Sequence, residues 1–368
     1  MTPARIPVAI VFGGRSSEHE ISCLSAGNVL AALDRDKYLP VPIGITREGA
    51  WHLQPDDPSF FRKVDDTLPA VLPHGDAAVL SMDPERRGFW LHPESGVPQW
   101  QEIDVVFPLL HGPNGEDGSI QGMLELAGIP FVGCGVFSSA ACMDKGHTKT
   151  ILGAAGLPVG SWHPVHARHW DADPDGVTAA VRGLGWPVFV KPARAGSSMG
   201  VAKVHQDVGL APAIEHAVTH DPRVVVEGAV ANAREIECGV LGHPDGTIAA
   251  SVCGEIKVHD SHEFYDYEAK YLADAVDLVV PAALTDVEAK ELRGLAVRAF
   301  EAMNCEGLAR VDFFLTESSE VIINEVNTMP GFTAGSMYPR MWQASGLGYA
   351  ELLDVLLQEA MARVPGMR

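Results

Sequence analysis

Short apolar strands alternate with helical stretches in the first part of this chain. The β-branched run Val8–Phe12 predicts a buried strand, and apolar residues then recur at helical spacing over 21–33. Further strands are predicted at Val41–Thr46 and Ile103–Leu110, with a second helix near Ile120–Ala127. This alternation is typical of a doubly wound α/β sheet, in which the loops at the carboxyl ends of the strands bind ligands.

The pattern changes after a helical stretch at Ser138–Gly156. Short strands at Pro187–Val190 and Val201–Val204 flank a glycine-rich turn, which predicts an antiparallel hairpin in a small α+β unit. The last part of the chain closes with a helix at Tyr349–Arg363 and contains four predicted strands before it, at Glu235–Leu241, Ile248–Ile256, Leu308–Leu315 and Val321–Val326.

Two helix starts have the spacing of a capping box, Ser17 with Glu20 and Thr285 with Glu288. The patterns together divide the 368 residues into three predicted domains, 1–137, 138–232 and 233–368. We expect the first to be α/β and the other two to be α+β.

The charge balance excludes some classes of partner. Lys and Arg number 27 and Asp and Glu number 48, so the formal net charge is −21, which opposes a general attraction to nucleic acid or to an anionic membrane. No run approaches the ~18 apolar residues of a bilayer-spanning helix. The six cysteines have no C-x-x-C spacing, so we expect buried, reduced thiols in a cytoplasmic protein.

The segments RVDFF and NEVN carry the most specific chemistry. Side chains alternate along a strand, so Arg310 and Asp312 share a face, as do Glu325 and Asn327, and the intervening TESSE predicts a turn that pairs the two strands. Carboxylate and amide oxygens without His or Cys suit Mg²⁺ or Mn²⁺. The alternative is a solvated hairpin whose polar face points to water.

The segment KPARAGSSMG has the composition of a phosphate-binding turn. Lys191 ends a strand, and the glycines around Ser197 and Ser198 allow backbone N–H groups to approach phosphate oxygens. The alternative is a mobile glycine-serine hairpin. A Walker A loop is absent from the sequence.

Three further segments have both a functional and a structural interpretation. HGPNGEDGSIQG can present His111 and Glu116 at a sheet edge, or Glu116 and Asp117 can cap the helix that follows. Glu18 taken alone is best explained as an acidic residue favoured by the dipole of its helix. HEFYDYEAKY is either a polar loop that covers a site or a surface loop without a role.

Taken together, these motifs resemble the D-alanine–D-alanine ligases of the ATP-grasp superfamily. GGRSSEHEIS, HGPNGEDGSIQG, KPARAGSSMG, FYDYEAKY and RVDFF with NEVNTMPG occur in the family's order along nearly the whole chain. The resemblance implies a three-domain ATP-grasp architecture with an N-terminal doubly wound domain. It also implies ligation of two D-alanine molecules through an acyl phosphate, with release of ADP and phosphate, for peptidoglycan precursor synthesis.

The resemblance implies roles for the residues around the first substrate. Glu18 matches the carboxylate that holds the ammonium of the first D-alanine. Ser197 and Tyr271 match its hydrogen-bond partners, which tie the glycine-serine loop and the lid over the substrate. His111 matches a residue beside the first substrate.

Other residues match the family's groups that act in the second step, bind the metal ions or bind ATP. Arg310 and the backbone N–H of Gly331 match the oxyanion stabilisers, and Ser336 matches a contact to the carboxylate of the second substrate. The ligands of two Mg²⁺ or Mn²⁺ ions match Asp312, Glu325 and Asn327. The family's ATP-binding residues are matched in this chain by Lys145, Lys191, Ser198, Glu227, Glu235 and Lys270. Of these, the two glutamates match contacts to the adenosine.

The expected partners are D-alanine and ATP, without nucleic acid or membrane, in a cytoplasmic homodimer. The alternative within the superfamily is a ligase with a different D-amino acid or D-hydroxy acid as second substrate. Tyr271 favours an amine, because the related D-lactate ligases have a different lid that lacks this tyrosine. A phosphate-binding module without turnover need not keep Arg310, Asp312, Glu325 and Asn327 together, and a metallohydrolase needs nitrogen or sulfur ligands.

Overall fold

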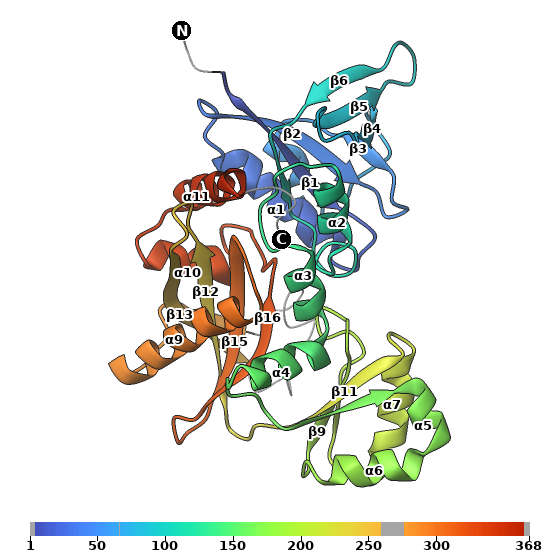
Figure 1. Ribbon diagram of the computed structural model, residues 1–368, viewed down its shortest axis with the longest axis vertical. Helices are drawn as coiled ribbons and strands as arrows, with labels where there is room; N and C mark the ends of the chain where they lie inside the picture. Colours follow the sequence, from blue (N-terminus) through green and yellow to red (C-terminus); the bar gives the residue numbers. More distant parts are fainter. Residues whose placement is uncertain (1–3, 66, 259–275, 364–368) are drawn as a thin grey trace.

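The computed structural model describes residues 4–65, 67–258 and 276–363, which form three β-sheets with helices packed against them (Figure 1). Tyr271 and Lys270 lie outside the described residues, as does the rest of HEFYDYEAKY. In the part of the chain that is described, no helix combines the length and the apolar character needed to cross a membrane.

The N-terminal sheet has seven strands in the order β6-β5-β4-β3-β2-β1-β7. Strand β1 (Ile6–Gly13) pairs in parallel with β2 (Tyr38–Ile45) and with β7 (Val105–Pro108), which confirms the predicted parallel core. The segment between β2 and β7, for which the sequence holds no motif, extends the sheet by antiparallel strands, namely β3 (Trp51–Leu53), β4 (Ala77–Leu80), β5 (Gly88–His92) and β6 (Gln99–Glu102). A 3₁₀ turn at Pro58–Phe61 lies between β3 and β4.

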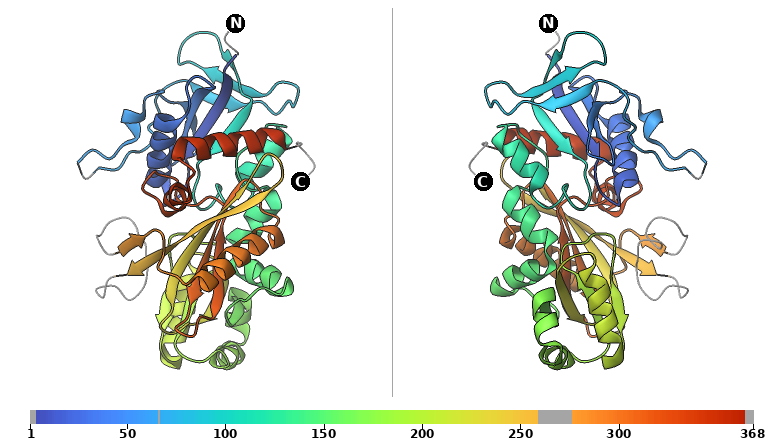
Figure 2. Two further views of the ribbon diagram at one scale, coloured as in Figure 1. Left: turned by 90° about the vertical axis from the view of Figure 1, so that its left-hand side faces the viewer. Right: turned by 90° about the vertical axis from the view of Figure 1, so that its right-hand side faces the viewer.

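Both faces of β1 are buried, which explains its continuous apolar sequence. Val8, Ile10 and Phe12 belong to a core shared with helices α1 (His19–Ala32) and α11 (Tyr349–Ala362). Ala9 and Val11 belong to a second core, which includes residues of α2 (Ser119–Leu126). The C-terminal helix α11 therefore lies between the N-terminal sheet and the rest of the chain (Figure 2).

The capping box predicted at Ser17 is wrong, whereas the one at Thr285 is confirmed. Helix α1 begins at His19, two residues beyond Ser17, and the Glu18 N–H donates to Ser16 Oγ at 3.1 Å. Glu20 pairs instead with Arg47. At the start of α9 (Asp286–Ala302), the side chains and backbones of Thr285 and Glu288 make both reciprocal hydrogen bonds.

The four-stranded sheet has the order β10-β9-β11-β8. Strands β9 (Val188–Pro192) and β10 (Ala202–Val204) form the predicted antiparallel hairpin. Strand β8 (Trp162–His166) is not among the predicted strands, and it contains a proline that is tolerated because β8 lies at the sheet edge. The remaining elements are β11 (Arg223–Gly228), a 3₁₀ turn at Asp207–Gly209 and the helices α5 (Ala167–Ala172), α6 (Pro174–Arg182) and α7 (Leu210–Val218).

The five-stranded sheet has the order β14-β13-β12-β15-β16 and is antiparallel throughout. Its strands are β12 (Arg234–Gly242), β13 (Ile248–Val258), β14 (Val276–Val279), β15 (Leu308–Leu315) and β16 (Val321–Asn327). Helix α9 packs on it through Leu292, Ala296 and Phe300, and α10 (Met337–Ala344) follows β16.

The helical stretch predicted at 138–156 is two helices, α3 (Val136–Met143) and α4 (Lys145–Ala154). Asp144 breaks the stretch because its backbone is extended, and its carboxylate accepts the His147 N–H at 3.0 Å to cap α4. Cys142 and Leu152 pack into the core of the five-stranded sheet. The boundaries between the three domains stay predictions. All six cysteines are free and buried.

Tyr38 joins the N-terminal sheet to α11 through its hydroxyl, which donates to Asp354 at 2.7 Å and accepts from Gln358 at 2.9 Å. Tyr38→Phe removes both bonds from a buried group, so we expect a loss of about 1–2 kcal/mol in the free energy of unfolding, measured by urea titration. Lys37→Ala is the control, because Lys37 contacts the same Asp354 from an exposed position. Equal stability of Tyr38→Phe and the wild type would contradict the inferred role.

Candidate active site

A cavity of about 1270 Å³ lies where the three sheets approach one another. Every described residue that the sequence predicts for the site lines it. These are Glu18, His111, Lys145, Lys191, Ser197, Ser198, Glu227, Glu235, Arg310, Asp312, Glu325, Asn327, Gly331 and Ser336. The structure therefore gathers segments as far apart in the sequence as Glu18 and Ser336, although the individual roles of these residues stay proposals.

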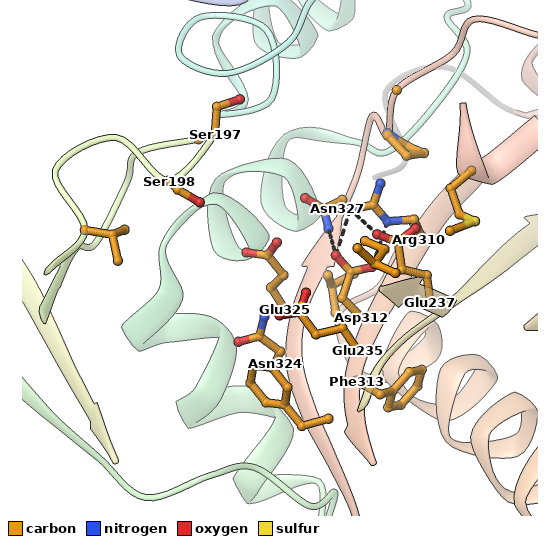
Figure 3. Close-up of a pocket in the computed structure, with 18 of the residues that line it drawn as sticks. Ser197, Ser198, Glu235, Glu237, Arg310, Asp312, Phe313, Asn324, Glu325 and Asn327 are labelled. Carbon is orange, nitrogen blue, oxygen red and sulfur yellow. Dashed lines mark hydrogen bonds and ion pairs between the residues drawn. The ribbon is translucent and has the colours of Figure 1, made fainter. Parts of the chain in front are cut away.

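The polar face of the β15–β16 hairpin forms one wall of the cavity (Figure 3). Arg310 lies opposite Asn327, and Asp312 lies opposite Glu325. Arg310 donates to both carboxylate oxygens of Asp312, from Nε and from Nη2, at 2.7 Å each. The Asn327 amide donates to Asp312 Oδ2 at 2.9 Å. The solvated-hairpin alternative fails, because this face borders a cavity and the side chains of Arg310 and Asp312 are largely buried.

Carboxylates keep Arg310 charged away from bulk water. Burial alone would lower the pKa of the guanidinium, but Asp312 and Glu237 outweigh it and raise the pKa well above its usual value. Glu237 contributes from β12, where it lies opposite Asp312 and 3.3 Å from Arg310 Nη2. Arg310 is therefore a permanent positive charge at the wall of the cavity.

The oxygen donors of this wall fit a hard divalent cation. Asp312 and Glu325 lie opposite each other on the paired strands β15 and β16, and Asn327 adds an amide oxygen. This set of donors contains no nitrogen or sulfur ligand. Among the residues that the structure describes, no cluster of three or more His, Cys, Asp or Glu side chains forms a metal cage. Two carboxylates and an amide leave coordination positions for phosphate oxygens and water, which is the usual way proteins bind Mg²⁺.

The glycine-serine turn approaches the N-terminal sheet through Ser197. Its hydroxyl donates to Glu18 Oε1 at 2.5 Å, so the turn after β9 is joined to the residue that precedes α1. Ser197 and Ser198 both have positive φ, at 47° and 56°. Such backbone conformations are unfavourable for residues other than glycine and persist where the surrounding structure fixes them, often at functional sites.

Two lysines hold Glu227 between them at the other side of the cavity. Lys191 on β9 contacts one carboxylate oxygen of Glu227 at 2.8 Å, and Lys149 on α4 contacts the other at 3.3 Å. Burial alone would raise the pKa of Glu227, but the two lysines lower it to about 2. One net positive charge thus remains in this triad at neutral pH, beside the turn that is expected to bind phosphate.

Lys145 reaches the same turn from the start of α4. Its ammonium donates to the Ala195 carbonyl at 2.8 Å, and its backbone N–H donates to the Ala193 carbonyl at 3.0 Å. Glu235 enters the cavity from β12, opposite Ile256 of β13. The cavity is therefore cationic near the turn and acidic along β12, β15 and β16.

The loop after β7 carries two acidic residues with different contacts. Asp117 caps the following helix, since its oxygens accept the N–H groups of Asn114 at 2.9 Å and Ser119 at 3.0 Å. Glu116 does not cap, so that interpretation is confirmed for Asp117 and wrong for Glu116. Burial and the charge of Glu18 raise the pKa of Glu116 to about 8, although two backbone N–H groups oppose the shift.

His111 lies buried beside this loop. Burial lowers its pKa, so the imidazole is neutral at pH 7. Nδ1 is 3.1 Å from the Met329 carbonyl and must carry the proton, because a carbonyl can only accept. Nε2 has no hydrogen-bond partner among the described residues and is left as an acceptor in the cavity wall.

The segment after β16 completes the cavity with Gly331 and Ser336. Ser336 precedes α10, and its hydroxyl accepts the Thr333 N–H at 3.2 Å and lies 2.8 Å from the Thr333 hydroxyl. The sequence interpretation missed two residues that support the site, Lys149 and Glu237. Lys149 follows Lys145 by four residues in a helical stretch, and Glu237 follows Glu235 by two in a strand, so the spacing alone could have indicated both.

Two family models together match most of the chain. The model described as "D-ala D-ala ligase N-terminus" matches residues 7–134, and the one described as "D-ala D-ala ligase C-terminus" matches residues 151–358. Among curated relatives, a D-alanine–D-alanine ligase of Streptomyces griseus is 51% identical over 100% of this chain and 95% of its own length. One of Kineococcus radiotolerans is 52% identical over 98% of each chain.

Solved structures agree with the sequence relatives. The VanG D-Ala:D-Ser ligase from Enterococcus faecalis superposes with a TM-score of 0.84 at 36% identity, covering 97% of this chain and 100% of its own. The D-alanine-D-alanine ligase from Coxiella burnetii superposes with a TM-score of 0.81, also at 36% identity, covering 97% of this chain and 94% of its own. The predicted ATP-grasp architecture is therefore confirmed.

Glu227→Gln leaves two lysines without their shared counter-charge, so we expect it to lower the free energy of unfolding by about 3–5 kcal/mol at pH 7. The pKa of Glu227 is depressed in the folded state, so its ionised form stabilises the protein above pH 4.5, its unfolded value, and this contribution is lost as the pH falls towards about 2. The difference between variant and wild type should therefore shrink on acidification. Urea titrations at pH 7 and pH 3.5 measure it.

Asp207→Asn is the matched control, because Asp207 also pairs with a cation in this part of the chain but is exposed. It should change stability little at either pH. A Glu227→Gln variant as stable as the wild type at pH 7 would contradict the inferred ion triad.

Proposed function

The chain belongs to the D-alanine–D-alanine ligase family, and we propose that its cavity joins two D-alanine molecules, with ATP converted to ADP and phosphate, for peptidoglycan synthesis. One observation carries the proposal: a carboxylate suited to an amine, lysines suited to phosphates, and Arg310 among oxygen donors all face one cavity. On the family resemblance alone, we also propose a homodimer in the cytoplasm.

The first step brings two anions together, the carboxylate of one D-alanine and the γ-phosphate of ATP. Glu18, held by Ser197, binds the ammonium of this D-alanine, and the neutral His111 can accept a hydrogen bond at Nε2. Lys145 and Lys191 attract the phosphates beside the Gly/Ser turn, where Ser198 adds a donor. A substrate oxygen then attacks phosphorus, the bond to the β-phosphate oxygen breaks, and acyl phosphate and ADP result.

The second step is attack by the deprotonated amine of another D-alanine on the carbonyl of the acyl phosphate. Negative charge develops on the carbonyl oxygen, and Arg310 and the Gly331 N–H stabilise it. Ser336 contacts the carboxylate of the second substrate. The tetrahedral intermediate breaks its C–O bond to phosphate, the departing phosphate takes the proton that the attacking nitrogen loses, and the dipeptide remains. Tyr271 and Lys270, which we propose in the lid, lie outside the described residues.

Asp312, Glu325 and Asn327 would hold Mg²⁺ or Mn²⁺, in two sites as the family resemblance implies. When bound, the ions neutralise charge on the phosphates of ATP. Glu235 and Glu227 are proposed near the adenosine. Lys149 and Lys191 hold the carboxylate of Glu227 in place at the cavity wall.

A second D-amino acid other than D-alanine is the less favoured alternative. The structural neighbour from Enterococcus faecalis is named a D-Ala:D-Ser ligase, but it is 36% identical to this chain. The curated relatives at 50–52% identity are named D-alanine–D-alanine ligases.

We expect the purified protein to release ADP from ATP only when D-alanine and Mg²⁺ are both present. A coupled ADP assay across D-alanine, L-alanine, D-serine and D-lactate measures the preference. D-alanine should exceed D-serine as second substrate by about tenfold or more in kcat/KM. ADP release with another amino acid and none with D-alanine would overturn the substrate assignment.

Glu325→Gln should lower kcat at least about 100-fold, because it removes a carboxylate from the metal-binding wall. Isothermal titration of Mg²⁺ in the presence of ADP should show weaker binding by the variant. Glu317→Gln is the control, since Glu317 lies exposed in the turn that joins the same two strands. Near-normal turnover of Glu325→Gln at saturating Mg²⁺ would count against the metal site.

A further inference from the structure

The backbone of Met329 is held on both sides by the loop after β7. Its carbonyl accepts from His111 Nδ1 at 3.1 Å, and its N–H donates to Glu116 Oε1 at 3.1 Å. Met329 follows β16 by two residues, so these bonds join segments more than two hundred residues apart in the sequence. Met329 itself is 6% exposed, which keeps water from competing for its backbone groups.

Glu116 is a bridge rather than a single contact. Its second oxygen, Oε2, accepts the Gly112 N–H at 2.8 Å, so one carboxylate fixes its own loop and the segment after β16. When Glu116 is ionised, its bonds to these two backbone N–H groups are charge-assisted, and such bonds are stronger than neutral ones. Asp117, its neighbour, accepts instead from Asn114 in the same loop and from Ser119 at the start of α2.

The held residue is two positions before Gly331. Pro330 lies between them, and its ring fixes one of the few backbone dihedral angles that separate Met329 from the Gly331 N–H. The position of Met329 therefore constrains the direction of this N–H, since only the ψ rotations of Met329 and Pro330 remain between them. A displacement of about 1 Å in a group that acts on the reacting atoms can reduce a rate by about 100-fold.

We propose that Glu116 is a positioning residue for the ligation, which holds Met329 so that the Gly331 N–H points to the developing oxyanion. The inference rests on the proposed role of Gly331. It assigns to Glu116 a task in the acyl-transfer step, although the loop that carries Glu116 follows a strand of the N-terminal sheet and is proposed to contact the first substrate.

Substrate charge favours this arrangement. Burial and, to a smaller extent, the charge of Glu18 raise the pKa of Glu116, Arg310 opposes the rise, and His111 is neutral. The ammonium of a first D-alanine at Glu18 would cancel much of the repulsion and favour the ionised carboxylate, which accepts both N–H groups. Binding of the first substrate should therefore tighten the hold on Met329 before the second step.

The test compares Glu116→Ala, which has no acceptor, with Glu116→Gln, which keeps one. We expect Glu116→Ala to lower kcat about 100-fold while KM for ATP stays within about twofold, and Glu116→Gln to fall between it and the wild type. Hydrogen exchange followed by mass spectrometry should show faster exchange in peptides covering 328–331 for Glu116→Ala. Thermal unfolding checks that each variant is folded. If Glu116→Ala does not fold, the kcat and the hydrogen exchange of Glu116→Gln decide the question.

Asp117→Asn is the matched control, because it makes the same carboxylate-to-amide change as Glu116→Gln at the adjacent residue, whose two bonds go to Asn114 and Ser119 rather than to Met329. It should keep wild-type kcat and wild-type exchange over 328–331. A folded Glu116→Ala with normal kcat, an equal loss in Asp117→Asn, or unchanged exchange over 328–331 would each overturn the inference.

Arg310→Met separates this inference from the proposed function. If Arg310→Met loses turnover while Glu116→Ala does not, the role of Glu116 is wrong and the proposed function stands. If Arg310→Met keeps normal turnover, the proposed oxyanion site fails, and the inference about Glu116 fails with it.

Discussion

The register of β15 against its two neighbours is the constraint on which the site depends. Val311 and Phe313 point into the core and are at most 1% exposed, so Arg310 and Asp312, which alternate with them along the strand, must point to the cavity. A shift of one residue would place Arg310 and Asp312 in the core. The apolar side of the strand thus fixes the position of the charges on its other side, and pairing with β12 and β16 brings Glu237, Glu325 and Asn327 beside them.

The charged groups of the cavity stabilise one another in small sets rather than through contact with water. Arg310 remains charged because Asp312 and Glu237 flank it. Glu227 remains ionised because two lysines share it. A substrate with negative phosphates and carboxylates and a positive ammonium can therefore bind to charges that are already oriented, which lowers the cost of reorganisation during the reaction.

Several expectations fail or are incomplete for local reasons. Ser17 and Glu20 have capping-box spacing, but the chain turns at Ser16 and the helix starts later, so the spacing does not coincide with a helix start. The stretch 138–156 has continuous helical character, and only the extended backbone of Asp144 divides it. Glu116 has the sequence position of a helix cap, yet its side chain turns to Met329, a residue that no local pattern can associate with it.

The sequence by itself determined the strands and helices with strong periodicity, the hairpin of Arg310, Asp312, Glu325 and Asn327, and the family, because alternation and motif spacing are local properties of the chain. Only the tertiary structure decided that Ser197 forms a hydrogen bond with Glu18, that Lys149 forms an ion pair with Glu227, and that Glu116 accepts a hydrogen bond from Met329. These contacts join segments from different sheets. Their geometry follows from how the sheets pack around a shared cavity, and packing depends on the whole chain rather than on any short part of it.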